Sequence, residues 1–84
     1  MIDYRKSARK FILSQGKATA LRLFAAIEQL PEGDVKRLQG KRKPPLYRLR
    51  VGDYRVVFCT ENNVTTILRV DNRGDVYKKM KRGD

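Results

Sequence analysis

The chain has 84 residues, with 20 Lys and Arg, 9 Asp and Glu and no His, so its formal net charge is +11. This length predicts one domain over residues 1–84, and the sequence has neither the ~18 apolar residues of a membrane span nor the apolar stretch of a secretory signal. A single Cys excludes an internal disulfide framework and paired-cysteine zinc sites, and the lack of His excludes Ser-His and Cys-His nucleophile pairs.

The first third of the chain predicts two helices. Residues 1–4 are long enough only for a short edge strand, and Ser7 is suited to cap the first helix. Gly16 separates that helix from a second one, which begins at Lys17 and is ended by Pro31. The apolar residues at helical spacing are Ala8, Phe11 and Ile12 in the first helix and Ala20, Leu23, Phe24, Ile27 and Leu30 in the second.

The rest of the chain predicts strands. Residues 35–45 are interpreted as a connector, because a glycine, three consecutive cations and a Pro-Pro pair occupy its second half. From residue 46 the apolar period changes to two, and strands are predicted at 46–51, 54–60, 64–70 and 75–78. The predicted fold class is α+β, with two N-terminal helices packed on one face of a four- to five-stranded antiparallel sheet.

The predicted 46–60 hairpin separates apolar from basic side chains. A two-residue turn at Gly52-Asp53 places Arg50 opposite Arg55, with Arg48 on the same face. Arg69 joins this face if the next strand turns Leu68 and Val70 into the core. The apolar face is Tyr47, Leu49, Val51, Tyr54, Val56 and Phe58.

The cluster of arginines has two interpretations. Like charges directly across a sheet are destabilising, so these side chains either fan apart into water or surround an anion. Arginine favours bidentate recognition of phosphate, where lysine would be sufficient for solubility. Most of the positive charge also lies in this part of the chain, since residues 35–84 carry fourteen basic and five acidic side chains. A phosphate-binding face is therefore the functional hypothesis.

Further candidates lie beside the hairpin. Tyr77 is either an edge-strand tyrosine or a residue for base stacking or proton transfer, and Arg73 precedes it in the turn at 71–74. The charge runs at 41–43 and 78–82 are either solvated or part of an RNA-binding surface. The candidate RNA-binding residues are Lys41, Lys43, Arg50, Arg69, Lys78 and Lys79.

Three segments, in their order along the chain, resemble the RelE/ParE family of toxins from bacterial and archaeal toxin–antitoxin systems. They are residues 30–35 with Leu38 and Gly40, residues 47–58 and residues 73–77, so that the likeness spans nearly the whole chain. The resemblance implies a cytoplasmic toxin that a cognate antitoxin neutralises by wrapping around it. It implies no metal ion and no small-molecule cofactor.

The RelE branch of the family implies a metal-independent endoribonuclease. Its activity is ribosome-dependent cleavage of mRNA in the A site, in which the 2′-hydroxyl attacks the adjacent phosphodiester and leaves a 2′,3′-cyclic phosphate. By position, four residues match the family's active site: Arg48, Arg55, Arg73 and Tyr77. Cations stabilise the developing phosphorane, but arginine exchanges protons poorly, so Tyr77 is the candidate base, with Lys41 or Lys43 as alternatives.

Two other functions remain open. The ParE branch shares the fold but acts on DNA gyrase, and it generally lacks the clustered arginines and tyrosine. A basic RNA-binding module without catalysis would fit the charge but leaves the hairpin motif unexplained. The presence of Arg48, Arg55, Arg73 and Tyr77 favours the nuclease.

Overall fold

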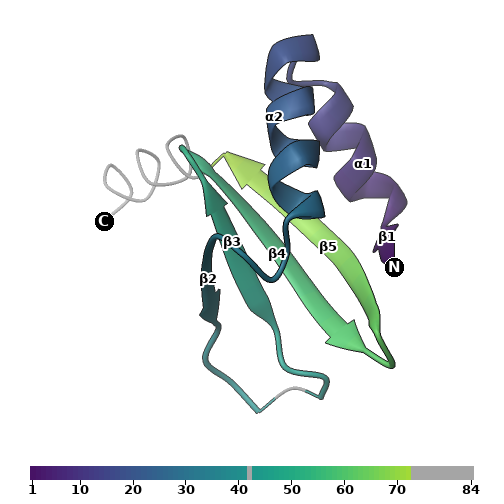
Figure 1. Ribbon diagram of the computed structural model, residues 1–84, viewed down its shortest axis with the longest axis vertical. Helices are drawn as coiled ribbons and strands as arrows, with labels where there is room; N and C mark the ends of the chain where they lie inside the picture. Colours follow the sequence, from purple (N-terminus) through teal and green to yellow (C-terminus); the bar gives the residue numbers. More distant parts are fainter. Residues whose placement is uncertain (42, 73–84) are drawn as a thin grey trace, which may run out of the picture.

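The computed structural model describes residues 1–41 and 43–72, and within them two helices cover one face of a five-stranded sheet (Figure 1). The strand order is β1-β5-β4-β3-β2. The elements are β1 (Ile2–Tyr4), α1 (Lys6–Leu13), α2 (Lys17–Glu28), β2 (Asp34–Arg37), β3 (Tyr47–Val51), β4 (Tyr54–Glu61) and β5 (Val64–Asn72). The predicted α+β class is confirmed; the strand predicted at 75–78 lies outside the described residues.

The helices form where apolar residues recur at helical spacing, and those residues enter the core. Buried side chains on α1 and α2 are Ala8, Ile12, Ala20, Leu23 and Ile27. Gly16 is the N-cap of α2 and has a φ of 93°, which glycine adopts far more readily than other residues. The predicted cap at Ser7 is wrong, because α1 already begins at Lys6, with Arg5 as its N-cap.

The β1 strand lies at one edge of the sheet and packs against α2. It pairs in parallel with β5, in contrast to the antiparallel neighbours elsewhere in the sheet. The ring of Tyr4 lies edge-on to Phe24 of α2, with 5.5 Å between the ring centroids. Burial, together with the nearby charge of Glu28, raises the pKa of Tyr4 above its ordinary value. The predicted edge strand is therefore confirmed, with a parallel partner that the sequence pattern did not indicate.

The segment at 34–37 corrects the predicted connector, because it forms the edge strand β2. Asp34 pairs with Arg50 and Val35 with Leu49, so β2 extends the basic hairpin by one strand. With one apolar residue in four, β2 has no alternation long enough to be recognised from sequence. Its pairing with β3 supplies the strand conformation.

The β3–β4 hairpin has the predicted register throughout. Arg50 lies opposite Arg55, and the turn glycine, Gly52, has a φ of 59°. The Asn62–Asn63 turn that follows also has positive φ at both residues, as expected of a tight hairpin.

The β5 strand departs from prediction in two ways. It continues through Asp71 and Asn72, which the sequence assigned to a turn. The pairing of β4 with β5 also shifts in register at Val57. Arg69 lies opposite Val57, and Leu68 has no partner in β4. A bulge of this kind interrupts the alternation of faces, so that Leu68 and Arg69 both lie outside the core between the buried Ile67 and Val70.

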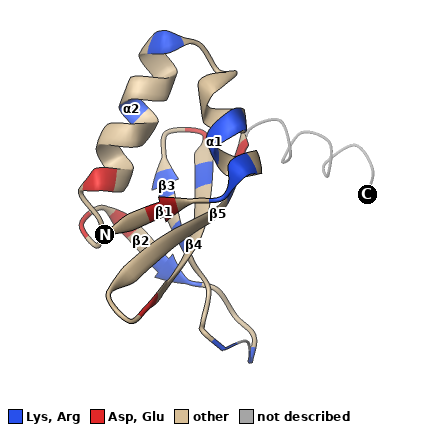
Figure 2. Ribbon diagram, turned by 90° about the vertical axis from the view of Figure 1, so that its right-hand side faces the viewer, with Lys and Arg blue, Asp and Glu red and all other residues tan. Residues whose placement is uncertain are grey.

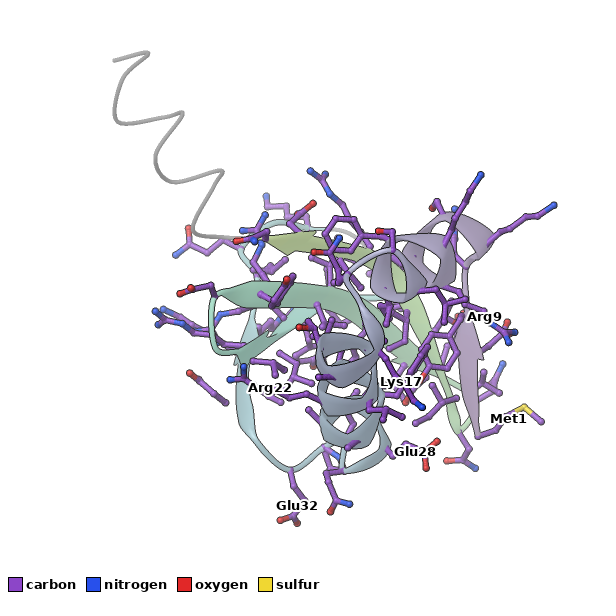
Figure 3. All side chains as sticks on the ribbon, turned by 90° about the horizontal axis from the view of Figure 1, so that it is seen from above. Met1, Arg9, Lys17, Arg22, Glu28 and Glu32 are labelled. Carbon is purple, nitrogen blue, oxygen red and sulfur yellow. The ribbon has the colours of Figure 1, made fainter. Side chains whose placement is uncertain are left out.

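The hydrophobic core lies between the helices and the sheet. Its fully buried large side chains are Ile12, Leu23, Ile27, Leu49, Val56 and Ile67. No helix in the described part of the chain is long and apolar enough to span a membrane. The helices leave the opposite face of the sheet uncovered (Figures 1 and 3).

Candidate functional site

The face of the sheet opposite α1 and α2 gathers cations from four adjacent strands, and we call it the arginine face. Strand alternation places Lys36 on it from β2, Arg48 and Arg50 from β3, Arg55 from β4 and Arg69 from β5. Figure 2 shows Lys and Arg along these strands and on the β2–β3 loop. Two carboxylates, Asp34 and Asp71, share the face.

Asp34 forms an ion pair with one arginine of this face, and Asp71 forms ion pairs with two. The Nη1 of Arg48 donates to the backbone oxygen of Asp34 at 2.9 Å and to its Oδ1 at 3.2 Å. Asp71, whose side chain is 16% exposed, accepts from Arg55 at 3.4 Å and from Arg69 at 3.0 Å. These contacts fix the guanidinium groups and offset the repulsion between Arg50 and Arg55. Among the residues that the structure describes, the two carboxylates do not balance the five cations, so their net charge on this face is positive.

One hollow of about 350 Å³ lies on the arginine face, and we call it the phosphate hollow. Its lining is Lys36, Arg37, Leu38, Gln39, Arg48 and Arg55. Four of the six residues are cations, and none is acidic. Guanidinium groups present paired N–H donors that match two phosphate oxygens. The hollow is therefore suited to an anion with the geometry of a phosphate.

A second hollow of about 370 Å³ lies beside the first, and we call it the apolar slot. Its lining is Arg5, Leu38, Leu46, Arg55, Val57, Leu68 and Arg69. Leu38 and Arg55 line both hollows, so the two adjoin. The slot combines an aliphatic surface with three cations, in contrast to the largely polar phosphate hollow.

The structure brings together four of the ten predicted site residues: Arg48, Arg50, Arg55 and Arg69. Lys41 and Lys43 are exposed on the loop between β2 and β3 and line neither hollow. The predicted Arg73, Tyr77, Lys78 and Lys79 lie outside the described residues. No group of His, Cys, Asp or Glu among residues 1–41 and 43–72 is arranged to hold a metal ion.

Other residues of the site are not predicted by the sequence pattern. Lys36 and Arg37 line the phosphate hollow, but the sequence assigned them to a connector. Asp71 was assigned to a turn, although it lies directly opposite Arg55 in the sheet. In each case the strand pairing was the missing information. No local signal in the sequence indicated Arg5, which reaches the slot from the start of α1.

Comparison with known proteins identifies relatives of this chain. A family model described as the ParE toxin of the type II toxin–antitoxin system parDE matches residues 2–77. No curated protein sequence gives a match.

Solved structures with the same fold include chains of two complexes of RelE with RelB. The RelE–RelB complex of Pyrococcus horikoshii contains a chain that is 28% identical, with a TM-score of 0.70 over 87% of this chain and 93% of that one. The RelB–RelE antitoxin–toxin complex of Methanococcus jannaschii gives 22% identity and a TM-score of 0.69 over 92% and 96% of the two chains. A conserved hypothetical protein of Helicobacter pylori gives 18% identity and a TM-score of 0.58 over 87% and 93%.

Proposed function

The chain belongs to the family described as the ParE toxin of type II toxin–antitoxin systems, and from its arginine face we propose that it is a ribosome-dependent endoribonuclease that cleaves mRNA in the A site. The observation that carries the proposal is the phosphate hollow, in which Arg48 and Arg55 converge from two strands beside Lys36. A site for cleaving RNA needs fixed positive charge around one phosphodiester, and this hollow provides it.

The proposed reaction is an attack by the RNA's own 2′-hydroxyl on the adjacent phosphorus. A bond forms between the 2′-oxygen and phosphorus, the bond to the 5′-oxygen breaks, and a 2′,3′-cyclic phosphate and a 5′-hydroxyl result. The transition state carries more negative charge on its non-bridging oxygens than the substrate does. Arg48 and Arg55 are held by Asp34 and Asp71 before RNA binds, so little reorganisation is needed to stabilise that charge.

The remaining roles are assigned by resemblance and charge. We assign Arg73 to the scissile phosphate and Tyr77 to proton transfer, with Lys41 or Lys43 as alternative bases. Arginine is a poor base because its pKa lies above ~12. The RNA strand on either side would contact the remaining cations: Lys41, Lys43, Arg50, Arg69, Lys78 and Lys79. No metal ion or cofactor is part of the proposal.

We further propose that residues 1–84 act as one domain in the cytoplasm with a cognate antitoxin as partner. The two archaeal relatives were solved as complexes with RelB, which supports an antitoxin for this chain. The ribosome and its mRNA are the proposed targets. An antitoxin segment with acidic side chains would complement the arginine face and exclude RNA from it.

A second function, inhibition of DNA gyrase, is favoured by the family model, whose description is ParE. Induction of the chain in growing cells, followed by mapping of mRNA 5′ ends, separates the candidates. We expect cuts at a fixed phase within codons of translated reading frames. Intact mRNA with arrested supercoiling would instead assign the chain to gyrase, and neither effect would leave a non-catalytic RNA-binding module.

The substitution Asp71→Asn is expected to strengthen binding to single-stranded RNA and to make it more dependent on salt. Asp71 neutralises part of the charge of Arg55 and Arg69, so its removal frees positive charge for a phosphate. One additional phosphate contact makes the slope of log K against log salt concentration more negative by about 0.7. Titrations at several salt concentrations measure this slope.

The matched control is Asp53→Asn, which removes the same charge at the exposed β3–β4 turn. It changes the net charge equally but leaves the arginine face intact. Equal salt slopes for the two variants would show that net charge, and not the pairing of Asp71 with the arginines, governs the affinity.

A further inference from the structure

We propose that the apolar slot holds a nucleobase of the RNA, namely that of the nucleotide whose phosphate occupies the adjoining phosphate hollow. This inference rests on the proposed function and extends it from the scissile phosphate to the base beside it. The slot is formed by Leu38, Leu46, Val57 and Leu68 and is bordered by Arg5, Arg55 and Arg69.

The first observation is an aliphatic surface in the middle of a basic face. Leu38, Leu46 and Leu68 are half-buried, and Val57 is 8% exposed, although the helices lie on the other side of the sheet. Leu68 follows the buried Ile67 and therefore lies on this face, and the bulge opposite Val57 keeps Arg69 on the same face beside it. A regular strand would instead place two successive residues on opposite faces.

The second observation is that the slot adjoins the phosphate hollow. Arg55 lines both, so a phosphate bound to its guanidinium lies at the border of the slot. A nucleotide has a flat, weakly polar base attached through a sugar to its phosphate, and these two parts match the two hollows. The 38% exposure of the Arg55 side chain leaves its guanidinium accessible while Asp71 holds it.

The third observation is the charge around the slot. Arg5, Arg55 and Arg69 border it, and Asp71, which contacts Arg55 and Arg69, is 16% exposed. Three cations favour a ligand that carries negative charge next to its apolar part. A base attached to a polyanionic backbone gains from both the aliphatic surface and the cations, and guanidinium planes also stack on bases.

The slot is expected to accept different bases with small differences in affinity. Its aliphatic surface offers van der Waals contact to the face of any base, and such contact is tolerant of sequence. Hydrogen-bond donors come from the arginines at its border. Discrimination between bases would therefore be modest, and removal of the base altogether would have the larger effect.

Binding of small probes to the full-length chain tests the proposal without a ribosome. Adenosine 5′-monophosphate carries a base, ribose 5-phosphate is its match without one, and inorganic phosphate occupies only the phosphate hollow. Methyl NMR spectra of the leucines and valines report contact with an aromatic ring. We expect adenosine 5′-monophosphate to bind at least about fivefold more tightly than ribose 5-phosphate and to shift the methyl signals of Leu46 and Leu68.

The variant Leu68→Ser should remove most of the difference between the two ligands while leaving phosphate binding unchanged. Leu46→Ser provides a second test from another strand if the first variant does not fold. The control Leu21→Ser alters a leucine that is 60% exposed on α2, on the helix side, and should keep the full difference.

Equal affinities for the two ligands, without methyl shifts, would overturn the inference. The proposal that the protein cleaves mRNA would still stand. A leucine-containing acidic peptide that shifts these methyl signals when the nucleotide does not would also overturn it, because the slot would then accept protein. If the nucleotide binds as expected but cells show intact mRNA, the slot is supported and the nuclease assignment fails.

Discussion

The substitution Arg55→Ala is expected to reduce the rate of mRNA cleavage by about 10²- to 10³-fold, the usual effect of removing one group that stabilises developing oxyanion charge. Arg55 is the residue that lines both the phosphate hollow and the apolar slot, and Asp71 fixes it in place. Single-turnover cleavage of mRNA bound in the ribosomal A site measures the effect on the chemical step.

Two further variants separate charge from geometry. Arg55→Lys keeps the charge but loses the planar pair of donors, so we expect a rate between those of the wild type and Arg55→Ala. Arg9→Ala removes an exposed cation from α1 on the helix side of the molecule (Figure 3) and should retain full activity. A cleavage rate for Arg55→Ala equal to that of Arg9→Ala would remove Arg55 from the catalytic site.

The substitution Gly33→Ala is expected to destabilise the fold by about 2 kcal/mol, which corresponds to a fall in Tm of roughly 8–16 °C for a domain of this size. Gly33 has a φ of 114°, and a Cβ atom there would lie 2.9 Å from Cδ1 of Leu49, which is 2% exposed in the core. Thermal unfolding followed by circular dichroism measures the change. The position precedes Asp34, so the start of β2 and the support of Arg48 depend on it.

The control Gly40→Ala distinguishes the contact from the backbone conformation. Gly40 has a φ of 135°, but a Cβ atom there would meet nothing within 4 Å. Backbone strain alone should therefore lower Tm by less than the combination of strain and contact at Gly33. An equal fall in the two variants would mean that Leu49 moves aside at little cost.

Much of the fold follows from patterns that are local in sequence. The period of 3.6 placed Ala20, Leu23 and Ile27 on the buried face of α2, and the two-residue turn at Gly52-Asp53 set the register of the hairpin. Register then decides the faces, because side chains of a strand alternate. The proximity of Arg48, Arg50 and Arg55 could for this reason be predicted from the sequence.

The errors occur where pairing with another strand overrides a weak local signal. Residues 34–37 have little strand pattern of their own and become β2 because β3 provides a partner. Asp71 and Asn72 look like a turn, yet they extend β5 opposite β4. The bulge at Leu68 is likewise a property of the β4–β5 pair, so the sequence of β5 alone could not place that side chain.

By itself, the sequence determined that the protein is a small, basic α+β chain with its arginines on one side of a hairpin. Composition gave the charge, and short-range periodicity gave the helices and the register, since both act over a few neighbouring residues. The tertiary structure alone decided what surrounds those arginines. Asp34, Asp71 and Leu68 reach the site through contacts between paired strands, and such contacts depend on how the sheet pairs.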